Sequence, residues 1–209
     1  MIVLKDNFTL KIDCQTYIAL GSFDGIHLGH ISLIKKIVEL SKKNNVKSMV
    51  FTFNNHPLSI INPERAPKLL IRNEEKLELL EKNKVDIVNL ANFNTDLMKI
   101  TPEDFIKRMK ECYNVKGFVA GFNYRFGYKN QGDVTLLKDI CSKLNVETYI
   151  MDSVMHKDEV ISSTRIRELL AEGDIITTNE MLTEPFFLCG IIIKGKQLGH
   201  KIGFPTVNL

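Results

Sequence analysis

The chain has 209 residues, 44% of them hydrophobic and 25% charged, which excludes an extensively disordered chain and a fibrous repeat. Its formal net charge of +3 is too small to indicate a nucleic-acid-binding protein. No apolar run approaches the roughly 20 residues that a membrane-spanning helix requires, and the first residues lack a signal-peptide pattern, so we expect a cytoplasmic protein without a nucleic-acid or membrane partner.

Short β-rich runs alternate with amphipathic helical patterns along most of the chain. This alternation predicts parallel strands joined by crossover helices, and hence a Rossmann-like, doubly wound α/β sheet of about five strands. The predicted strands cover residues 16–21, 46–53, 85–90, 115–121 and 146–151, and the predicted helices cover 29–43, 74–82, a segment that begins after Thr101, 133–144 and 162–172.

The pattern changes after Gly173, which is expected to end a helix. One more helix and a proline-marked turn precede the new β-rich run FFLCGIIIKG. We therefore expect a first domain over residues 1–184, and we interpret 185–209 as the beginning of a second, β-rich domain, because so few residues cannot bury a core of their own. The four cysteines lack a CxxC pair, so we expect reduced, buried thiols.

The stretch GSFDGIHLGH, residues 21–30, follows the first predicted strand and leads into the first predicted helix. Ligands of open α/β sheets bind at this edge, where helix amino termini attract anions. His27 and His30 can face one locus, and Gly29 between them lets a phosphate approach the backbone. Neither GxGxxG nor GxxxxGK[ST] is present, so a different phosphate site is expected. By themselves, the two histidines also fit polar caps or a metal site with Asp24.

A second stretch, ISSTRIR, begins the last helix of the predicted sheet domain. The hydroxyls of Ser163 and Thr164 and the free N–H groups of a helix start can bind phosphate oxygens. Arg167 lies one turn after Thr164 on the same face, so the three residues form a candidate polyphosphate clamp. A plain helix cap with solvated arginines is the alternative.

Two more stretches follow predicted strands. FTFNNHP, residues 51–57, places His56 and Pro57 in an extended bend, which a simple turn would also explain. VAGFNYRFGYKNQGD, residues 119–133, interleaves aromatic residues with Asn123 and Arg125, a pattern suited to stacking on a planar heterocycle but also to satellite core residues. The shared location of all four stretches at strand ends favours one nucleotide site.

In this order, GSFDGIHLGH, FTFNNHP, GFNYRFG and ISSTRIR resemble motifs of the bacterial bifunctional riboflavin kinase/FAD synthetase family, in its amino-terminal FMN adenylyltransferase module. The HxGH half alone would indicate only the wider nucleotidylyltransferase superfamily. The resemblance implies a nucleotidylyltransferase-type fold, ATP and FMN as substrates, FAD and pyrophosphate as products, and Mg²⁺ as cofactor. It implies no oligomeric state.

Carried onto this sequence, the resemblance implies three groups of site residues. The catalytic residues are His27, His30 and Arg167; the ATP-binding residues are Gly21, Phe23, Asp24, Gly25, Gly29, Ser163 and Thr164; and the flavin-binding residues are His56, Pro57, Asn123, Arg125 and Phe126.

The last residues, GKQLGHKIGFPTVNL, resemble the opening of the family's riboflavin kinase module. Thr206 and Asn208 would correspond to kinase positions that hold magnesium and nucleotide phosphate. Because the chain stops at Leu209 without the rest of the kinase barrel, we expect no riboflavin kinase activity from it.

Three other functions stay open at this point. A relative in the same superfamily could transfer a nucleotide to another phosphate, such as nicotinate mononucleotide, phosphopantetheine or glycerol phosphate. A regulatory module with a dead site would bind flavin without releasing pyrophosphate. A metal-binding protein would use Asp24, His27 and His30 and would retain zinc through purification.

Overall fold

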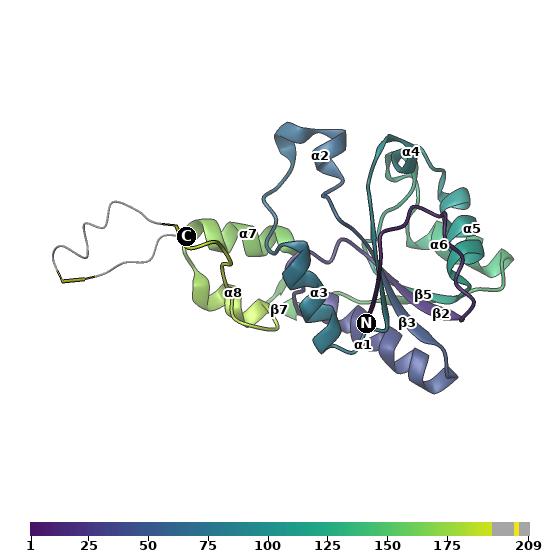
Figure 1. The fold of residues 1–209 in the computed structure, drawn as a ribbon, viewed down its shortest axis with the longest axis horizontal. Coiled ribbons are helices and arrows are strands. Elements are labelled where there is room, and N and C mark those ends of the chain that lie inside the picture. Colours follow the sequence, from purple (N-terminus) through teal and green to yellow (C-terminus); the bar gives the residue numbers. More distant parts are fainter. Residues whose placement is uncertain (194–202, 205–209) are drawn as a thin grey trace.

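The computed structural model describes residues 1–193, 203 and 204, and its centre is a six-stranded parallel β-sheet with helices on both faces (Figure 1). The strand order is β1-β4-β3-β2-β5-β6, and each neighbouring pair is parallel. The strands are β1 (Ile2–Leu4), β2 (Thr16–Leu20), β3 (Lys47–Phe53), β4 (Ile87–Ala91), β5 (Val115–Gly121) and β6 (Glu147–Met151), and a separate antiparallel pair consists of β7 (Met155–His156) and β8 (Glu159–Val160).

Several helices that cover the sheet begin and end at the capping residues that the sequence indicates. Thr101 and Asp133 cap α5 and α6 through their side-chain oxygens, and Gly173 ends α7 in the left-handed conformation. The helices are α1 (Leu28–Asn44), α2 (Leu58–Ile61), α3 (Asn73–Lys82), α4 (Thr95–Met98), α5 (Pro102–Tyr113), α6 (Val134–Lys143), α7 (Ser163–Glu172) and α8 (Ile175–Met181), with single 3₁₀ turns at Pro63–Arg65 and Tyr128–Asn130.

Two hydrophobic layers sandwich the sheet, because successive residues of a strand point to opposite faces. In β2, Tyr17 and Ala19 face the layer that contains α1 and α3, whereas Ile18 and Leu20 face the layer that contains α5 and α6. All five residues of this central strand are buried. This is the doubly wound α/β architecture that the sequence predicts, and the prediction is confirmed.

The chain reverses direction across the sheet between β2 and β5. From β2 it moves outward through β3 to β4, and it then returns to the other side of β2 to form β5 and β6. The loops that leave the carboxyl ends of β2 and β5 therefore diverge, and such a switch point is where open α/β sheets bind ligands.

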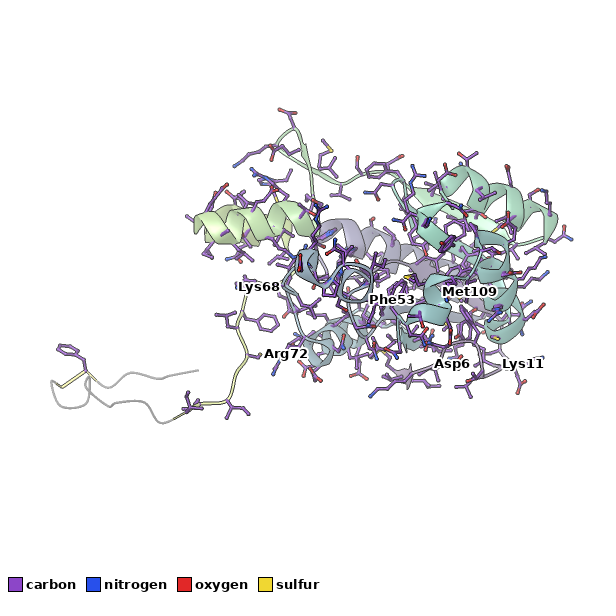
Figure 2. All side chains as sticks on the ribbon, turned by 90° about the horizontal axis from the view of Figure 1, so that it is seen from above. Asp6, Lys11, Phe53, Lys68, Arg72 and Met109 are labelled. Atoms are coloured by element: carbon purple, nitrogen blue, oxygen red, sulfur yellow. The ribbon has the colours of Figure 1, made fainter. Side chains whose placement is uncertain are left out.

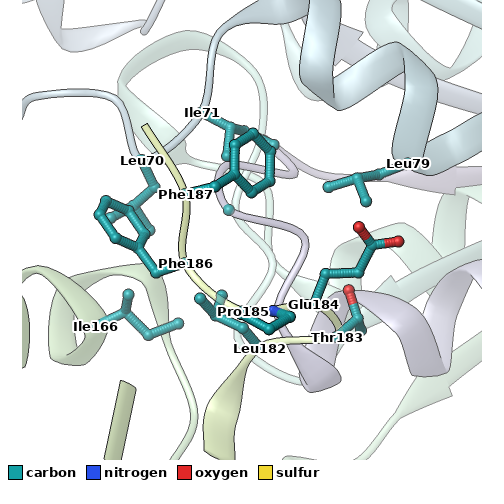
Figure 3. Close-up of a pocket in the computed structure, with 11 residues that line it drawn as sticks. Leu70, Ile71, Leu79, Ile166, Leu182, Thr183, Glu184, Pro185, Phe186 and Phe187 are labelled. Atoms are coloured by element: carbon teal, nitrogen blue, oxygen red, sulfur yellow. The ribbon is translucent and has the colours of Figure 1, made fainter. Parts of the chain in front are cut away.

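A third, smaller hydrophobic cluster joins α7 and α8 to the loop that precedes α3. Its buried members include Leu70, Ile166 and Met181. The segment after α8 continues this packing: Phe186 lies beside Leu70 and Phe187 beside Ile71 at a small pocket (Figure 3). The site elements on α7 are therefore held against the sheet domain by apolar contacts.

Several details differ from the sequence predictions. Strand β1 adds a sixth strand, and the β7–β8 pair, α2 and α4 were not predicted. Cys112 and Cys141 are buried as expected, but Cys14 and Cys189 are exposed, and all four thiols are free. Among residues 185–193 no strand is formed, although Ile193 makes a single bridge. The expected domain division at residue 184 stays a prediction.

None of the described helices is long and apolar enough to cross a membrane.

Candidate active site

A cleft of about 770 Å³ opens at the switch point, above the carboxyl ends of the central strands. Segments from all four motifs contribute to its walls, together with residues 152–154 and Val160. The predicted site residues that line it are Gly21, Asp24, His27, Gly29, His30, His56, Pro57, Asn123, Arg125, Phe126, Ser163, Thr164 and Arg167. The structure thus brings residues from distant parts of the chain into one cavity.

Two predicted ATP-binding residues lie elsewhere. Phe23 is completely buried in the layer below α1 and does not line the cleft. Gly25 lines the small pocket next to Leu70 instead, and its φ of +83° belongs to the left-handed region that favours glycine. Both residues shape the turn that carries Asp24 into the cleft. Thr206 and Asn208, expected to form a kinase-type magnesium site, lie outside the described residues.

His27 and His30 form a stacked pair at the start of α1. Their ring centroids are 3.6 Å apart and their planes differ by 20°. His27 caps the helix, because its Nδ1 accepts a hydrogen bond of 3.3 Å from the backbone N–H of His30. In a neutral ring this bond assigns the proton of His27 to Nε2.

Burial keeps both imidazoles neutral at physiological pH. It lowers the pKa of His27 to about 4, and it lowers the pKa of His30 well below its usual value. A protonated His27 and the charge of Lys76 act on His30 in the same direction. Nδ1 of His30 is buried and has no hydrogen-bond partner among the described residues. An unpaired buried nitrogen is costly, so this atom is a candidate to meet a ligand.

Asp24 connects three segments at the back of the cleft. One of its carboxylate oxygens accepts N–H bonds from Leu70 at 3.0 Å and Ile71 at 3.4 Å, and the other pairs with the guanidinium of Arg167. The backbone oxygen of Asp24 accepts a 2.9 Å bond from the Ser163 hydroxyl. Both oxygens of this carboxylate are therefore engaged in holding α7 and the loop before α3 in place.

Arg167 is bound on two sides. Besides its ion pair with Asp24, its Nε donates a 2.8 Å hydrogen bond to the backbone oxygen of Lys68. Lys68 begins the segment that leads to α3, and it is labelled in Figure 2. The guanidinium is thus held in one orientation while it still lines the cleft, as a preorganised anion-binding group requires.

The amino termini of two helices meet at the cleft. Gly29 lies in the first turn of α1, and Ser163 and Thr164 are the first two residues of α7. Ser162 caps α7 by accepting a 3.2 Å hydrogen bond from the N–H of Arg165. Helix starts carry free N–H groups and partial positive charge, so this end of the cleft suits phosphate groups.

Part of the cleft lining is aromatic. Phe126 is buried and stacks on Tyr124, with ring centroids 5.6 Å apart. Phe53, which lies within FTFNNHP, and Phe93, which lies outside the four motifs, were not predicted as site residues; they meet edge to face at 5.4 Å and also line the cleft. Planar apolar walls of this kind can accept a planar ring.

Polar residues stand among these aromatic walls. Asn123 and Arg125 are exposed, and Arg125 lies 3.6 Å from the carboxylate of Asp133. His56 Nδ1 accepts a 3.1 Å bond from the N–H of Leu58, so His56 caps the bend before α2. Burial lowers the pKa of His56, and the charges of Arg167 and Lys76 lower it further, while Asp24 opposes them.

The residues of this site do not fit the zinc site considered from the sequence. Within the described part of the chain, no three His, Cys, Asp or Glu side chains are grouped to hold a metal ion. The carboxylate of Asp24, the expected third ligand, is occupied by Arg167 and two backbone N–H groups. The arrangement supports anion binding better than metal binding.

Lys76 is a second feature that motif reasoning missed. It lies on α3 with only 4% of its surface exposed, next to the ends of β2 and β3. The available sequence signal is its spacing, because Lys76 precedes the buried Leu79 and Leu80 by three and four residues and so shares their helix face.

Because the pKa of His27 is lowered in the folded protein, we expect the protein to lose stability in acid. In the unfolded chain a histidine takes up a proton near pH 6.5, whereas folded His27 resists protonation down to about pH 4. The unfolded state therefore binds more protons in this window, and the free energy of unfolding should fall by about 2–3 kcal/mol from pH 7 to pH 4.5 through this group.

Urea denaturation at the two pH values measures this loss. The His27→Gln variant, which cannot take up the proton, should lose correspondingly less stability over the same interval. His156→Gln is the matched control, since His156 lies on β7 and pairs with Glu180 outside the cleft. Equal pH dependence in wild type and His27→Gln would contradict the prediction.

Comparison with known proteins gives relatives over nearly the whole chain. A family model described as FAD synthetase matches residues 9–165, and a riboflavin kinase model matches residues 182–209. A bifunctional riboflavin kinase/FMN adenylyltransferase of Buchnera aphidicola is 34% identical over 95% of this chain and 64% of its own length. The corresponding protein of Listeria monocytogenes is 34% identical over 94% of this chain and 63% of its length.

A solved structure has the same fold. The crystal structure described as a macrolide-efflux protein from Streptococcus pneumoniae matches with a TM-score of 0.84 and 28% identity, over 99% of this chain and 67% of that one. The chain spans less than two thirds of the length of the bifunctional relatives named above. Because the FAD synthetase model matches most of the chain, the chain belongs to the FAD synthetase family.

Proposed function

We propose that this chain transfers the adenylyl group of ATP to FMN, producing FAD and pyrophosphate. One observation carries the proposal: a stacked pair of neutral imidazoles lies in a single cleft that two helix amino termini and an aromatic wall share. This combination suits a substrate pair that consists of a polyphosphate and a planar ring system. Membership in the FAD synthetase family supports the same reaction.

The reaction needs little proton transfer. The phosphate of FMN has a second pKa near 6, so at neutral pH it is a dianion and a competent nucleophile. One of its oxygens forms a bond to the α-phosphorus of ATP while the bond from that phosphorus to the oxygen bridging to the β-phosphate breaks. The electron pair leaves with pyrophosphate, and no covalent enzyme intermediate forms. The task of the protein is therefore to position the reactants and to balance their charge.

We assign His27 and His30 to the α-phosphate of ATP, because negative charge builds up on its oxygens during the transfer. A neutral imidazole offers one N–H donor without losing a proton, and for His27 the donor is Nε2. The unpaired Nδ1 of His30 supports the same assignment, because a bound phosphate or ribose would provide the partner that the described protein atoms do not. Such preorganised donors stabilise a transition state without reorganising.

The start of α7 is assigned to the two phosphates that leave. Thr164 offers a hydroxyl group, and Ser163 and Thr164 both offer backbone N–H groups at the positive end of the helix, while the Ser163 hydroxyl donates to the backbone oxygen of Asp24. Arg167 adds a guanidinium that the ion pair with Asp24 orients. We assign Asp24 to this orientation instead of direct phosphate contact, since a carboxylate repels phosphate.

The aromatic part of the cleft lining is assigned to the flavin. Phe126 lies in the wall, and the exposed Asn123 and Arg125 can meet the polar edge or the phosphate of FMN. His56 and Pro57 form the facing bend. These assignments give the two substrates different parts of one cavity that the imidazole pair also lines.

The cleft does not supply a protein cage for magnesium. Its described acidic residues are Asp24 and Asp152, and the carboxylate of Asp24 is already engaged with Arg167 and backbone N–H groups. The Mg²⁺ expected from the sequence stays a prediction.

Pyrophosphate release from ATP and FMN, with FAD identified by chromatography, tests the proposal. We expect FAD and pyrophosphate in equal amounts with ATP and FMN. Parallel reactions replace FMN by nicotinate mononucleotide, phosphopantetheine or glycerol phosphate, and a further reaction replaces ATP by CTP. A reaction with riboflavin and ATP tests the expectation that this chain has no kinase activity.

Each result has a defined meaning. If pyrophosphate is released with another acceptor and not with FMN, that acceptor and not FMN is the substrate. Flavin binding without pyrophosphate release under any condition would identify a regulatory module with a dead site. Either outcome would overturn the proposed reaction, whereas stoichiometric FAD supports it.

A further inference from the structure

The side chain of Lys76 is buried without a carboxylate partner. It is 4% exposed, and its Nζ is within hydrogen-bond distance of two backbone oxygens, Ser22 at 3.2 Å and Phe53 at 3.5 Å. Among the described residues no carboxylate lies within ion-pair distance of it. Burying an ammonium group is costly, and an apolar side chain here would pack beside Leu79 and Leu80 without that cost.

The two acceptors of Lys76 are placed at the edge of the cleft. Phe53 is the last residue of β3 and Ser22 follows the end of the neighbouring strand β2. Both residues line the cleft, and Phe53 is labelled near the middle of the molecule in Figure 2. The oxygen of Ser22 also accepts a 2.8 Å bond from the Thr52 hydroxyl. Lys76 thereby joins the starting points of the loops that carry the paired histidines and His56.

The charges around Lys76 leave an excess of positive charge behind the cleft. Asp24 and Arg167 form an ion pair and cancel each other, so the ammonium of Lys76 adds one further positive charge to the group. The charge of Lys76 contributes to lowering the pKa of His30 and of His56. Burial lowers the pKa of Lys76 itself, and the nearby carboxylate of Asp24 acts against this effect.

We propose that Lys76 is a positioning residue for nucleotide binding: its buried ammonium fixes the carboxyl ends of β2 and β3 and places a fixed positive charge behind the paired imidazoles, opposite the anionic phosphates. The phosphate part of this inference rests on the proposed function. A charge in a poorly solvated place acts over a longer range than a surface lysine, which solvent and salt screen.

Three substitutions separate charge from hydrogen bonding. Lys76→Met removes both the charge and the two hydrogen bonds. Lys76→Gln removes the charge but keeps N–H donors, on a side chain one atom shorter, and Lys76→Arg keeps the charge. Lys110→Met is the matched control, because Lys110 is a partly buried lysine that donates a 2.6 Å bond to the backbone oxygen of Leu144 away from the cleft.

The first measurement is the NMR titration of the imidazoles of His30 and His56, which requires no activity. We expect the pKa of both histidines to rise in Lys76→Met and Lys76→Gln, and to stay at the wild-type values in Lys76→Arg and Lys110→Met. The proposal would be overturned if the pKa values of His30 and His56 in Lys76→Gln equalled those of the wild type. Because Lys76→Gln keeps a polar side chain, it decides the test even if Lys76→Met fails to fold.

The second measurement is ATP affinity by calorimetry, together with the KM values for ATP and FMN. Loss of the charge should weaken ATP binding and raise the KM for ATP by about tenfold, and the KM for FMN should change much less. An unchanged ATP affinity in both neutral variants would overturn the proposal. If the wild-type chain makes no FAD, the proposed function fails, but the titration and the calorimetry still decide the role of Lys76.

Discussion

FAD synthesis by the His30→Ala variant is expected to fall by about two orders of magnitude or more, with little change in folding. Removing one preorganised donor from the charge that develops in a transition state typically costs about 3 to 4 kcal/mol, and each 1.4 kcal/mol is a factor of ten in rate. The fold should tolerate the change, because Nδ1 of His30 has no described protein partner to lose.

Single-turnover FAD formation and a thermal unfolding curve measure the two parts of this prediction. His156→Ala is the matched control, since it removes a histidine that pairs with Glu180 outside the cleft. Near-normal FAD formation by His30→Ala would remove His30 from the proposed catalytic machinery. A large loss in the control would show that the effect is not specific to the cleft.

The Asp24→Ala variant is expected to lose both stability and activity. This change removes one partner of a buried ion pair and also leaves the N–H groups of Leu70 and Ile71 without their acceptor. Breaking a buried pair from one side typically costs about 3–5 kcal/mol. Because Arg167 would lose its orientation, phosphate binding at the start of α7 should weaken as well.

Urea denaturation measures the loss in unfolding free energy, and ATP calorimetry measures the loss in binding. Asp24→Asn keeps an acceptor oxygen but removes the charge, so it should fall between wild type and Asp24→Ala. A double-mutant cycle with Arg167→Met isolates the coupling between the two side chains, and we expect it to be favourable. An unchanged denaturation midpoint in Asp24→Ala would contradict the role assigned to this carboxylate.

The sequence was most informative where chemistry is local. Helix starts such as Thr101 and Ser162 and the helix end at Gly173 follow from residue type and position, because capping involves only neighbouring backbone groups. Strand β1 was missed because its three residues are too few to show a periodic pattern. The β7–β8 pair, with two residues in each strand, was missed for the same reason.

The location of the site could also be expected from the sequence, but its internal contacts could not. In a parallel sheet every strand ends at the same edge, so motifs that follow strands must converge there. Which polar groups then pair is a different question. Asp24 was expected to touch ATP, whereas the structure engages it with Arg167, 143 residues away. Phe23 was expected in the same site and lies in the core instead.

Short-range periodicity and chain connectivity are enough to predict the doubly wound sheet, the order of its longer elements, and the edge at which the motifs meet. Three features follow only from the three-dimensional packing: Asp24 pairs with Arg167, the two imidazoles stack and stay neutral, and Lys76 is buried behind them. The physical reason is that burial gives a polar group its energy and its pKa, and burial is produced by segments that are distant in the sequence.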